Sequence, residues 1–167
     1  VCDRVILMAH DYASTNLTGF VGTRYYRNHT CAPLYKVYYA VRTAAEQMDP
    51  DKLALAVSMD AMAWQTDENG LLTAAKPTRP LHTTVYQRLL QADTVMGWSD
   101  TTRSPWCTYT TESGQHIFLW YEDARSISQK LSCAKLVGVS GVSVWRLGTI
   151  PDHPDAGLYF DVMGVLF

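Results

Sequence analysis

Apolar and polar residues alternate in blocks that predict a strand, a helix and a second strand at the start of the chain. Residues 4–11, RVILMAHD, form a short apolar run rich in β-formers, which indicates a buried strand. Pro33 then precedes apolar residues at three- and four-residue spacing as far as Met48, the pattern of an amphipathic helix. Residues 52–64 are a second continuous apolar run and are predicted as the next buried strand. This order is typical of a parallel sheet.

The middle of the chain does not continue this alternation of strands and helices. Residues 67–70 predict a turn, and a short helix is expected near residues 83–92. Residues 105–122 predict two strands joined by a turn at Ser113 and Gly114. The segment therefore has the pattern of an α+β unit inserted into the parallel arrangement.

The parallel pattern resumes after this segment. Asp123 is placed to cap a helix that ends at Gly138, with one apolar face made of Ala124, Ile127, Leu131 and Ala134. Residues 141–147 predict a third core strand, and residues 154–167 a final helix. Three strands with their helices predict an α/β barrel or an open doubly wound sheet.

Polar and aromatic residues stand where the three predicted strands end. The end of the first predicted strand carries His10 and Asp11, that of the second carries Asp60, and that of the third carries Trp145. In such folds the carboxyl ends of the strands carry the functional side chains, because the loops converge there on a rigid scaffold. We therefore expect an imidazole, two carboxylates and an indole to lie close together at the carboxyl ends of the strands.

The amino-acid composition argues against two classes of protein, those that bind nucleic acid and those that span a membrane. With 47% hydrophobic residues, 18% charged residues and a net charge of −2, the chain has an ordinary globular composition without a basic patch for nucleic acid. Its longest apolar runs reach only about a dozen residues, short of the roughly 20 that a membrane span requires. The four cysteines and five histidines lack metal-ligand spacing, so the cysteines are interpreted as thiols, and no metal or cofactor is expected.

Three stretches carry a resemblance to a known family. LMAHD is similar to the M-x-Y-D strand end of glycoside hydrolase family 18, GVSVWRLG to its last barrel strand, and residues 119–148 to its spore-cortex and cell-wall glycosidase branch. The resemblance implies an α/β fold: the C-terminal part, strands 6–8, of a chitinase-like (β/α)8 TIM barrel with an α+β insertion between the last two strands. Residues 1–66 would form strands 6 and 7 with their helix, 67–118 the insertion, and 119–167 the last helix-strand-helix.

The resemblance also implies a function, namely cleavage of β-1,4-linked N-acetylglucosamine-containing glycans, peptidoglycan or chitin-like, by substrate-assisted retention. The family's general acid is the Glu of a D-x-x-D-x-D-x-E segment, which does not occur in these residues. No catalytic residue is therefore expected in this segment, which alone would be inactive. The alternative is a non-catalytic glycan-binding module on a degenerate barrel. An extracellular or cell-envelope location follows from where such glycans lie.

The resemblance assigns binding roles to the strand-end residues. Asp11 would orient the sugar acetamide, and Trp145 would form the floor of its subsite. His10 stands where the motif has Tyr, and Tyr12 is a nearby substitute for that phenol. Asp60 and Met62 stand where branch members often have an aromatic residue and an Arg. The alternatives are structural: Trp145 capping the core, Asp11 capping a loop, and Asp60 pairing with a cation.

Three parallel strands cannot close into a barrel. Both edges would present unpaired backbone N–H and C=O groups, and the barrel-facing side would lack cover. We expect this segment to pair with a missing N-terminal half of the barrel or with a second copy of itself.

Overall fold

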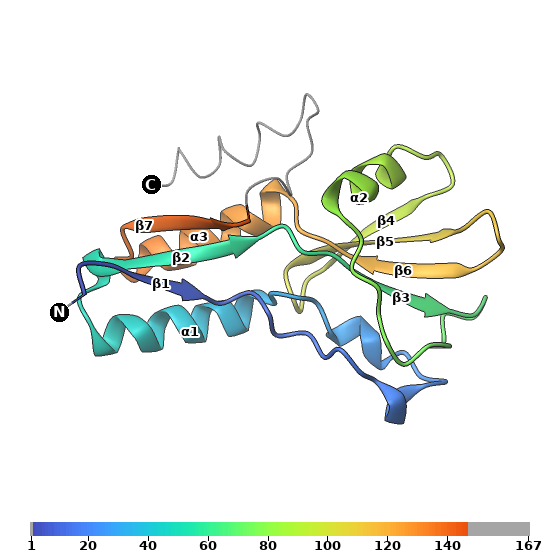
Figure 1. Cartoon of the computed structure of the whole chain (residues 1–167), viewed down its shortest axis with the longest axis horizontal. Helices are drawn as coiled ribbons and strands as arrows, with labels where there is room; N and C mark the ends of the chain where they lie inside the picture. The colour runs from blue at the N-terminus through green and yellow to red at the C-terminus, as the bar shows by residue number, and fades with distance from the viewer. Residues whose placement is uncertain (1, 147–167) are drawn as a thin grey trace.

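The computed structural model describes residues 2–146 and contains two sheets that follow one another along the long axis of the molecule (Figure 1). One sheet has three strands in the order β1-β2-β7, and the other has four in the order β3-β6-β5-β4. The chain crosses between them near the carboxyl ends of β1 and β2, so the junction lies beside the strand ends at which the sequence predicts a site.

The first sheet is parallel throughout. It consists of β1 (Val5–Met8), β2 (Leu53–Ser58) and β7 (Gly141–Trp145), with β2 in the centre. Ser58 is in register with Trp145, and Met8 with Ala56, so all three strands end at the same edge. The parallel arrangement predicted from the apolar runs at the two ends of the chain is confirmed.

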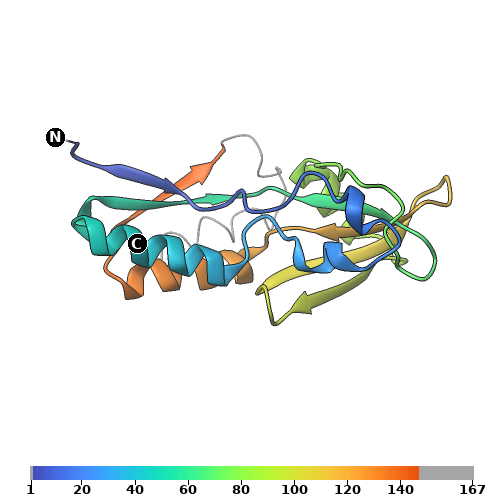
Figure 2. The same cartoon turned by 90° about the horizontal axis from the view of Figure 1, so that it is seen from below.

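Two helices, α1 (Leu34–Gln47) and α3 (Ala124–Leu136), lie on one side of this sheet (Figure 2). The buried core between helices and sheet is aliphatic: Val37, Val41, Leu53, Leu55, Val57, Ile127, Leu131 and Ala134. Asp123 caps α3 as predicted, because its carboxylate accepts from the Ser126 N–H and the Ser126 hydroxyl accepts from the Asp123 N–H. Gly138 ends the helix region with φ of 87°, a conformation that glycine adopts without strain.

The second sheet is antiparallel and lies between β2 and α3 in the sequence. Its strands are β3 (Met62–Thr66), β4 (Val95–Ser99), β5 (Ser104–Thr110) and β6 (His116–Trp120), and α2 (His82–Leu89) packs on one face. The other face carries an aromatic core with Tyr26, Trp64, Phe118 and Trp120. Short 3-10 helices occur at Thr18–Phe20, Tyr25–Asn28 and Pro50–Lys52.

The prediction of one strand over residues 52–64 is wrong. The chain leaves the parallel sheet after Ser58 and enters the antiparallel sheet at Met62. Both segments are buried, so hydrophobicity continues across the break, and only the change of pairing partner from β7 to β6 reveals it. The residues of the break include Asp60, which is thereby placed at the junction.

The antiparallel unit is also larger than expected. The resemblance implies limits at residues 67 and 118, whereas the sheet of this unit runs from Met62 to Trp120. The strand β4 is not predicted at all: it is an edge strand whose Val95 and Met96 are exposed, so it lacks a buried apolar pattern. The helix expected over residues 154–167 lies outside the described residues.

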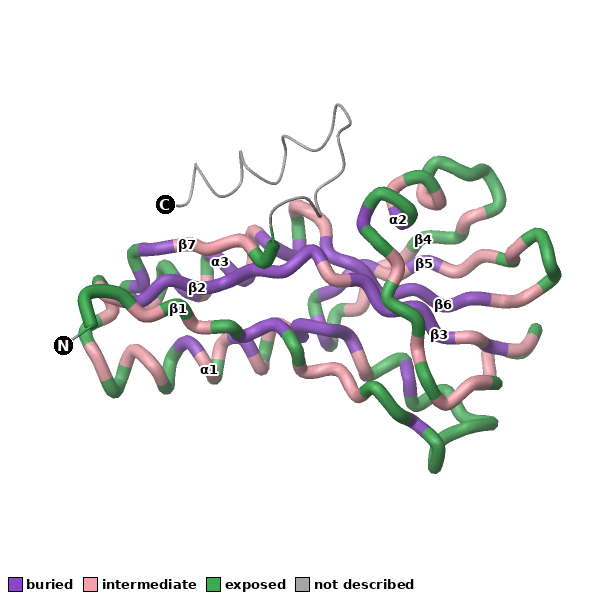
Figure 3. Tube along the Cα trace, viewed as in Figure 1, coloured by how far each residue is buried: buried purple, intermediate pink, exposed green. Residues whose placement is uncertain are grey.

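The central strand β2 is more deeply buried than its neighbours β1 and β7 (Figure 3). Every residue of β2 is buried, whereas β1 alternates, with Ile6 and Met8 each 55% exposed on the face opposite the helices. Within residues 2–146, β1 and β7 are the two edges of the parallel sheet. None of the helices in this part of the chain is long and apolar enough to span a membrane.

Candidate glycan-binding site

The carboxyl ends of β1, β2 and β7 bring three predicted site residues into one region. The rings of His10 and Trp145 are stacked, with their centroids 6.3 Å apart. The β2–β7 pairing continues past the strand end, because the Met59 N–H donates to the Trp145 carbonyl at 3.4 Å. This bond holds the backbone of Trp145 beside that of Met59, the residue before Asp60, while Trp145 stays 47% exposed.

Arg79 joins the two predicted carboxylates. Its Nη2 donates to Asp11 Oδ1 at 2.9 Å, and its Nη1 lies 3.5 Å from Asp60 Oδ2. The hydrogen bond to Asp11 raises the pKa of Arg79 further above its usual value, so the guanidinium remains cationic. The structure therefore brings Asp11 and Asp60 to the two sides of one cation.

A cleft of about 290 Å³ opens at this edge of the sheet. Its walls come from the residues after β2, from the segment before α2 and from the end of β7. They include Asp60, Arg79, His82, Trp145 and Arg146. An exposed indole next to hydrogen-bonding and charged groups can receive the apolar face of a sugar ring and bind its hydroxyl and amide groups.

His10 lies near the indole of Trp145. Its side chain is buried, at 5% exposure, and neither ring nitrogen has a hydrogen-bond partner among the described residues. Buried polar atoms of this kind are rare in folded proteins, because an unmade hydrogen bond costs about 1–3 kcal/mol. The imidazole therefore retains donor and acceptor capacity, but it lines a small buried cavity with Ser58 and Glu122 rather than the cleft beside Trp145.

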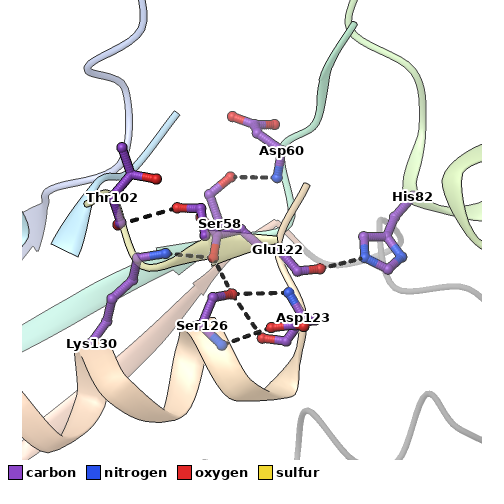
Figure 4. A network of polar contacts seen from close by, with 9 residues as sticks. Ser58, Asp60, His82, Thr102, Glu122, Asp123, Ser126 and Lys130 are labelled. Carbon is purple, nitrogen blue, oxygen red and sulfur yellow. Dashed lines mark hydrogen bonds and ion pairs between the residues drawn. The ribbon is translucent and has the colours of Figure 1, made fainter. Parts of the chain in front are cut away.

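A buried polar network lies next to the carboxyl end of β2 (Figure 4). Glu122 accepts from Lys130 Nζ at 2.5 Å and from the Ser126 hydroxyl at 2.6 Å, and its backbone carbonyl lies 3.1 Å from His82 Nε2. Burial raises the pKa of Glu122, and Lys130 opposes that rise. No sequence pattern predicts this ion pair, because only the tertiary structure buries Glu122 and Lys130 together.

The structure does not bring every predicted residue to the cleft. Tyr12 packs against the core under the parallel sheet, and Lys36 Nζ lies 5.4 Å from its ring centroid. Met62 is fully buried in the aromatic core of the antiparallel sheet. Of the predicted residues, Asp60 and Trp145 line the cleft. Asp11 lies next to it through its ion pair with Arg79, and His10 is buried near Trp145 without lining it.

A larger cleft, of about 570 Å³, lies at the far end of the antiparallel sheet. Its lining includes Arg27, Glu68, Tyr109, His116 and Phe118, and it shares no residue with the cleft beside Trp145. It is distant from the carboxyl ends of the parallel strands, where the side chains of three separate strands converge. We therefore place the candidate site at the smaller cleft.

The cysteines and candidate metal ligands of residues 2–146 form no metal-binding cluster. Burial raises the pKa of Cys31 to about 12, which keeps this thiol protonated and unreactive. The four cysteines are free, and the described residues contain no group of three or more His, Cys, Asp or Glu side chains that could hold a metal ion.

Arg79 is the site residue that sequence reasoning missed. It lies in the segment KPTRP, between two prolines, which resembles an ordinary loop. The ion pair with Asp11 joins residues 68 positions apart, and no local pattern reports such a pair. The only available signal was a single basic residue in a proline-rich loop.

Comparison with known proteins supports a relationship to a family of hydrolases. The sequence profile described as glycosyl hydrolases family 18 matches residues 1–149. The cortical fragment-lytic enzyme of Bacillus subtilis (strain 168) is 25% identical over 148 residues, which are 89% of this chain and 32% of that enzyme. The chain thus spans about a third of the length of this relative.

Solved structures share the fold. The spore cortex-lytic enzyme SleL of Bacillus cereus superimposes with a TM-score of 0.69 at 21% identity, over 96% of this chain and 35% of that one. A chitinase from Chromobacterium violaceum superimposes with a TM-score of 0.74 at 16% identity, over 98% of this chain and 45% of that one. With the profile match over most of its length, the chain belongs to glycosyl hydrolases family 18.

Proposed function

We propose that this chain is the C-terminal part, strands 6–8, of a family 18 (β/α)8 barrel that hydrolyses β-1,4-linked N-acetylglucosamine-containing glycans. The gathering of Asp11, Asp60 and Trp145 at the carboxyl ends of parallel strands carries the proposal, because these are the positions from which such barrels bind substrate. The antiparallel unit with α2 would be the insertion between the last two barrel strands.

In the proposed reaction the acetamide of the substrate is the nucleophile, and the configuration at the anomeric carbon is retained. Trp145 offers its exposed face to the sugar ring. Asp11 orients the acetamide, and the Arg79 guanidinium holds its carboxylate in place. The proton for the leaving oxygen comes from a Glu on a part of the barrel outside these residues.

The complete protein, including its upstream residues, tests this proposal. Chitooligosaccharides and purified cell-wall sacculi are incubated with it, and the anomeric configuration of the first product is followed by NMR. We expect cleavage with retention, and faster cleavage of sacculi would favour peptidoglycan, as the name of the cortical fragment-lytic relative suggests. Products of inverted configuration, or the absence of both cleavage and binding, would contradict the proposal.

A non-catalytic glycan-binding module is the second candidate. The observation that favours it is His10, an imidazole where the family motif has a Tyr, together with the burial of Met62 away from the cleft. In this case the complete protein would bind chitooligosaccharides without cleaving them. The same incubation separates the two candidates.

The free edges of the parallel sheet carry a proposal about partners. The apolar side chains of Ile6 and Met8 are exposed on the face opposite α1 and α3, and β1 and β7 are edges within residues 2–146. We infer that the remaining strands of the barrel, the N-terminal half, complete this face. Self-association through the same edges is the alternative when that half is absent.

A further inference from the structure

Arg79 occupies the centre of the candidate site although it belongs to neither sheet. It lies in the connection between β3 and α2, and its guanidinium reaches the carboxylates that follow β1 and β2. Three segments that are distant in the sequence therefore meet at one side chain. Two roles fit this position: holding the loop in place and binding a ligand in the cleft.

The backbone that carries Arg79 is held firmly. The neighbouring Thr78 pairs with Ala63 of β3 through two hydrogen bonds, Thr78 N–H to Ala63 O and Ala63 N–H to Thr78 O, both 2.9 Å. Pro77 and Pro80 flank this pair, and each proline ring fixes its own φ. The loop therefore remains attached to β3 without help from the Arg79 side chain.

The guanidinium still has donors for a ligand. Arginine has five N–H donors in a planar fork, and the contacts to Asp11 and Asp60 use only the two Nη atoms. The Arg79 side chain is 37% exposed and lines the cleft shared with Trp145. Partly exposed ion pairs contribute little to stability. Holding the loop in place therefore does not by itself explain why Arg79 lies between the two carboxylates.

We propose that Arg79 is a substrate-positioning residue, whose free N–H groups donate to an oxygen of the amino sugar that stacks on Trp145. Asp11 and Asp60 hold the guanidinium in a fixed orientation, so a sugar oxygen meets preorganised donors. The inference rests on the proposed function of this site, and it adds a residue from the antiparallel unit to a site otherwise built on parallel strands.

The test measures the affinity of the complete protein for triacetylchitotriose. We compare wild type with Arg79→Ala and Arg79→Lys, and use Arg42→Ala as the matched control, because Arg42 makes a similar ion pair with Glu46 on the exposed face of α1. We expect Arg79→Ala to bind about tenfold more weakly, which corresponds to about 1.4 kcal/mol. Arg79→Lys should be intermediate, since an ammonium keeps the charge without the planar fork. Arg42→Ala should match wild type.

Chemical rescue separates positioning from a structural role. Millimolar guanidinium ion added to Arg79→Ala should restore part of the lost affinity, because the free ion can occupy the position between Asp11 and Asp60. Loss of affinity without rescue, a lysine variant equal to wild type, or an alanine variant that binds normally would each overturn the inference while leaving the proposed function intact. A wild-type protein that neither binds nor cleaves these glycans overturns the proposed function, and the role of Arg79 with it.

Discussion

The imidazole of His10 and the indole of Trp145 lie nearly parallel, with ring planes inclined by 21°. His10 is buried, whereas Trp145 is 47% exposed and lines the cleft. A rigid, half-exposed aromatic ring of this kind presents a large apolar contact area at a low cost in conformational entropy.

Replacing Trp145 by alanine should weaken glycan binding without unfolding the protein. We expect affinity for triacetylchitotriose to fall at least about tenfold, or about 1.4 kcal/mol, while the melting temperature changes little because the indole is half exposed. Calorimetric titration of the complete protein measures both affinities. Tyr39→Ala, which removes an exposed aromatic ring from α1, is the control. Equal affinities for the two variants would remove Trp145 from the site.

The chain of residues 1–167 expressed alone should associate. The edges of β1 and β7 and the exposed side chains of Ile6 and Met8 favour pairing of strands between copies. Sedimentation equilibrium should give a mass above the 18.7 kDa of one chain, and addition of the N-terminal half should yield a one-to-one complex instead. Met8→Lys should reduce the self-association. A compact monomer at all concentrations would contradict the prediction.

Replacing Lys130 by methionine should destabilise the protein strongly. The variant leaves Glu122 buried without its cation, a change that costs about 3–5 kcal/mol in comparable ion pairs. Denaturant unfolding at neutral pH measures the loss. The control is the double variant Glu122→Gln with Lys130→Met, which removes the buried charge and should recover most of the stability.

The same variant should be less destabilised in acid. Burial raises the folded-state pKa of Glu122, and Lys130 opposes that rise, so Lys130→Met increases the shift. Between the unfolded pKa and this higher folded pKa, the folded state binds more protons than the unfolded state, and stability therefore falls as pH increases. The deficit of Lys130→Met should shrink as pH is lowered through that window. A deficit independent of pH would contradict this, because it would mean that Lys130→Met leaves the folded-state pKa of Glu122 unchanged.

Replacing Gly97 by alanine should destabilise the antiparallel sheet. A Cβ atom at this position would lie 2.2 Å from the ring of Trp106, so the indole must move. We expect a loss of about 1–3 kcal/mol, typical of an overpacked site. Gly19→Ala is the matched control, because a Cβ at Gly19 has no atom within 4 Å. Thermal unfolding of both variants measures the difference, and equal stabilities would mean that Trp106 can shift freely.

Several elements could be predicted from the sequence because their signals are local. The three- and four-residue spacing over α1, the cap at Asp123 and the Ser-Gly turn between β5 and β6 each depend on neighbouring residues. The strand-end positions of His10 and Trp145 followed from the apolar runs, whereas that of Asp60 depends on the break between β2 and β3, which lies inside one predicted strand. Their common edge followed from the parallel order of the strands.

Other features depend on contacts between distant residues. The break between β2 and β3 is set by pairing with β7 on one side and β6 on the other, and both segments are equally apolar. The edge strand β4 is stabilised by its partner β5 rather than by its own pattern.

The sequence by itself determined which segments are strands and helices at the two ends of the chain, and which polar residues stand at the strand ends, because period, caps and turns are encoded within a few neighbouring residues. The tertiary structure decided which sheet each strand joins, and it placed Arg79 between Asp11 and Asp60 and Lys130 against Glu122. The physical reason is that ion pairs and strand pairings between distant residues form only when packing brings them within a few ångströms, and no local pattern records that distance.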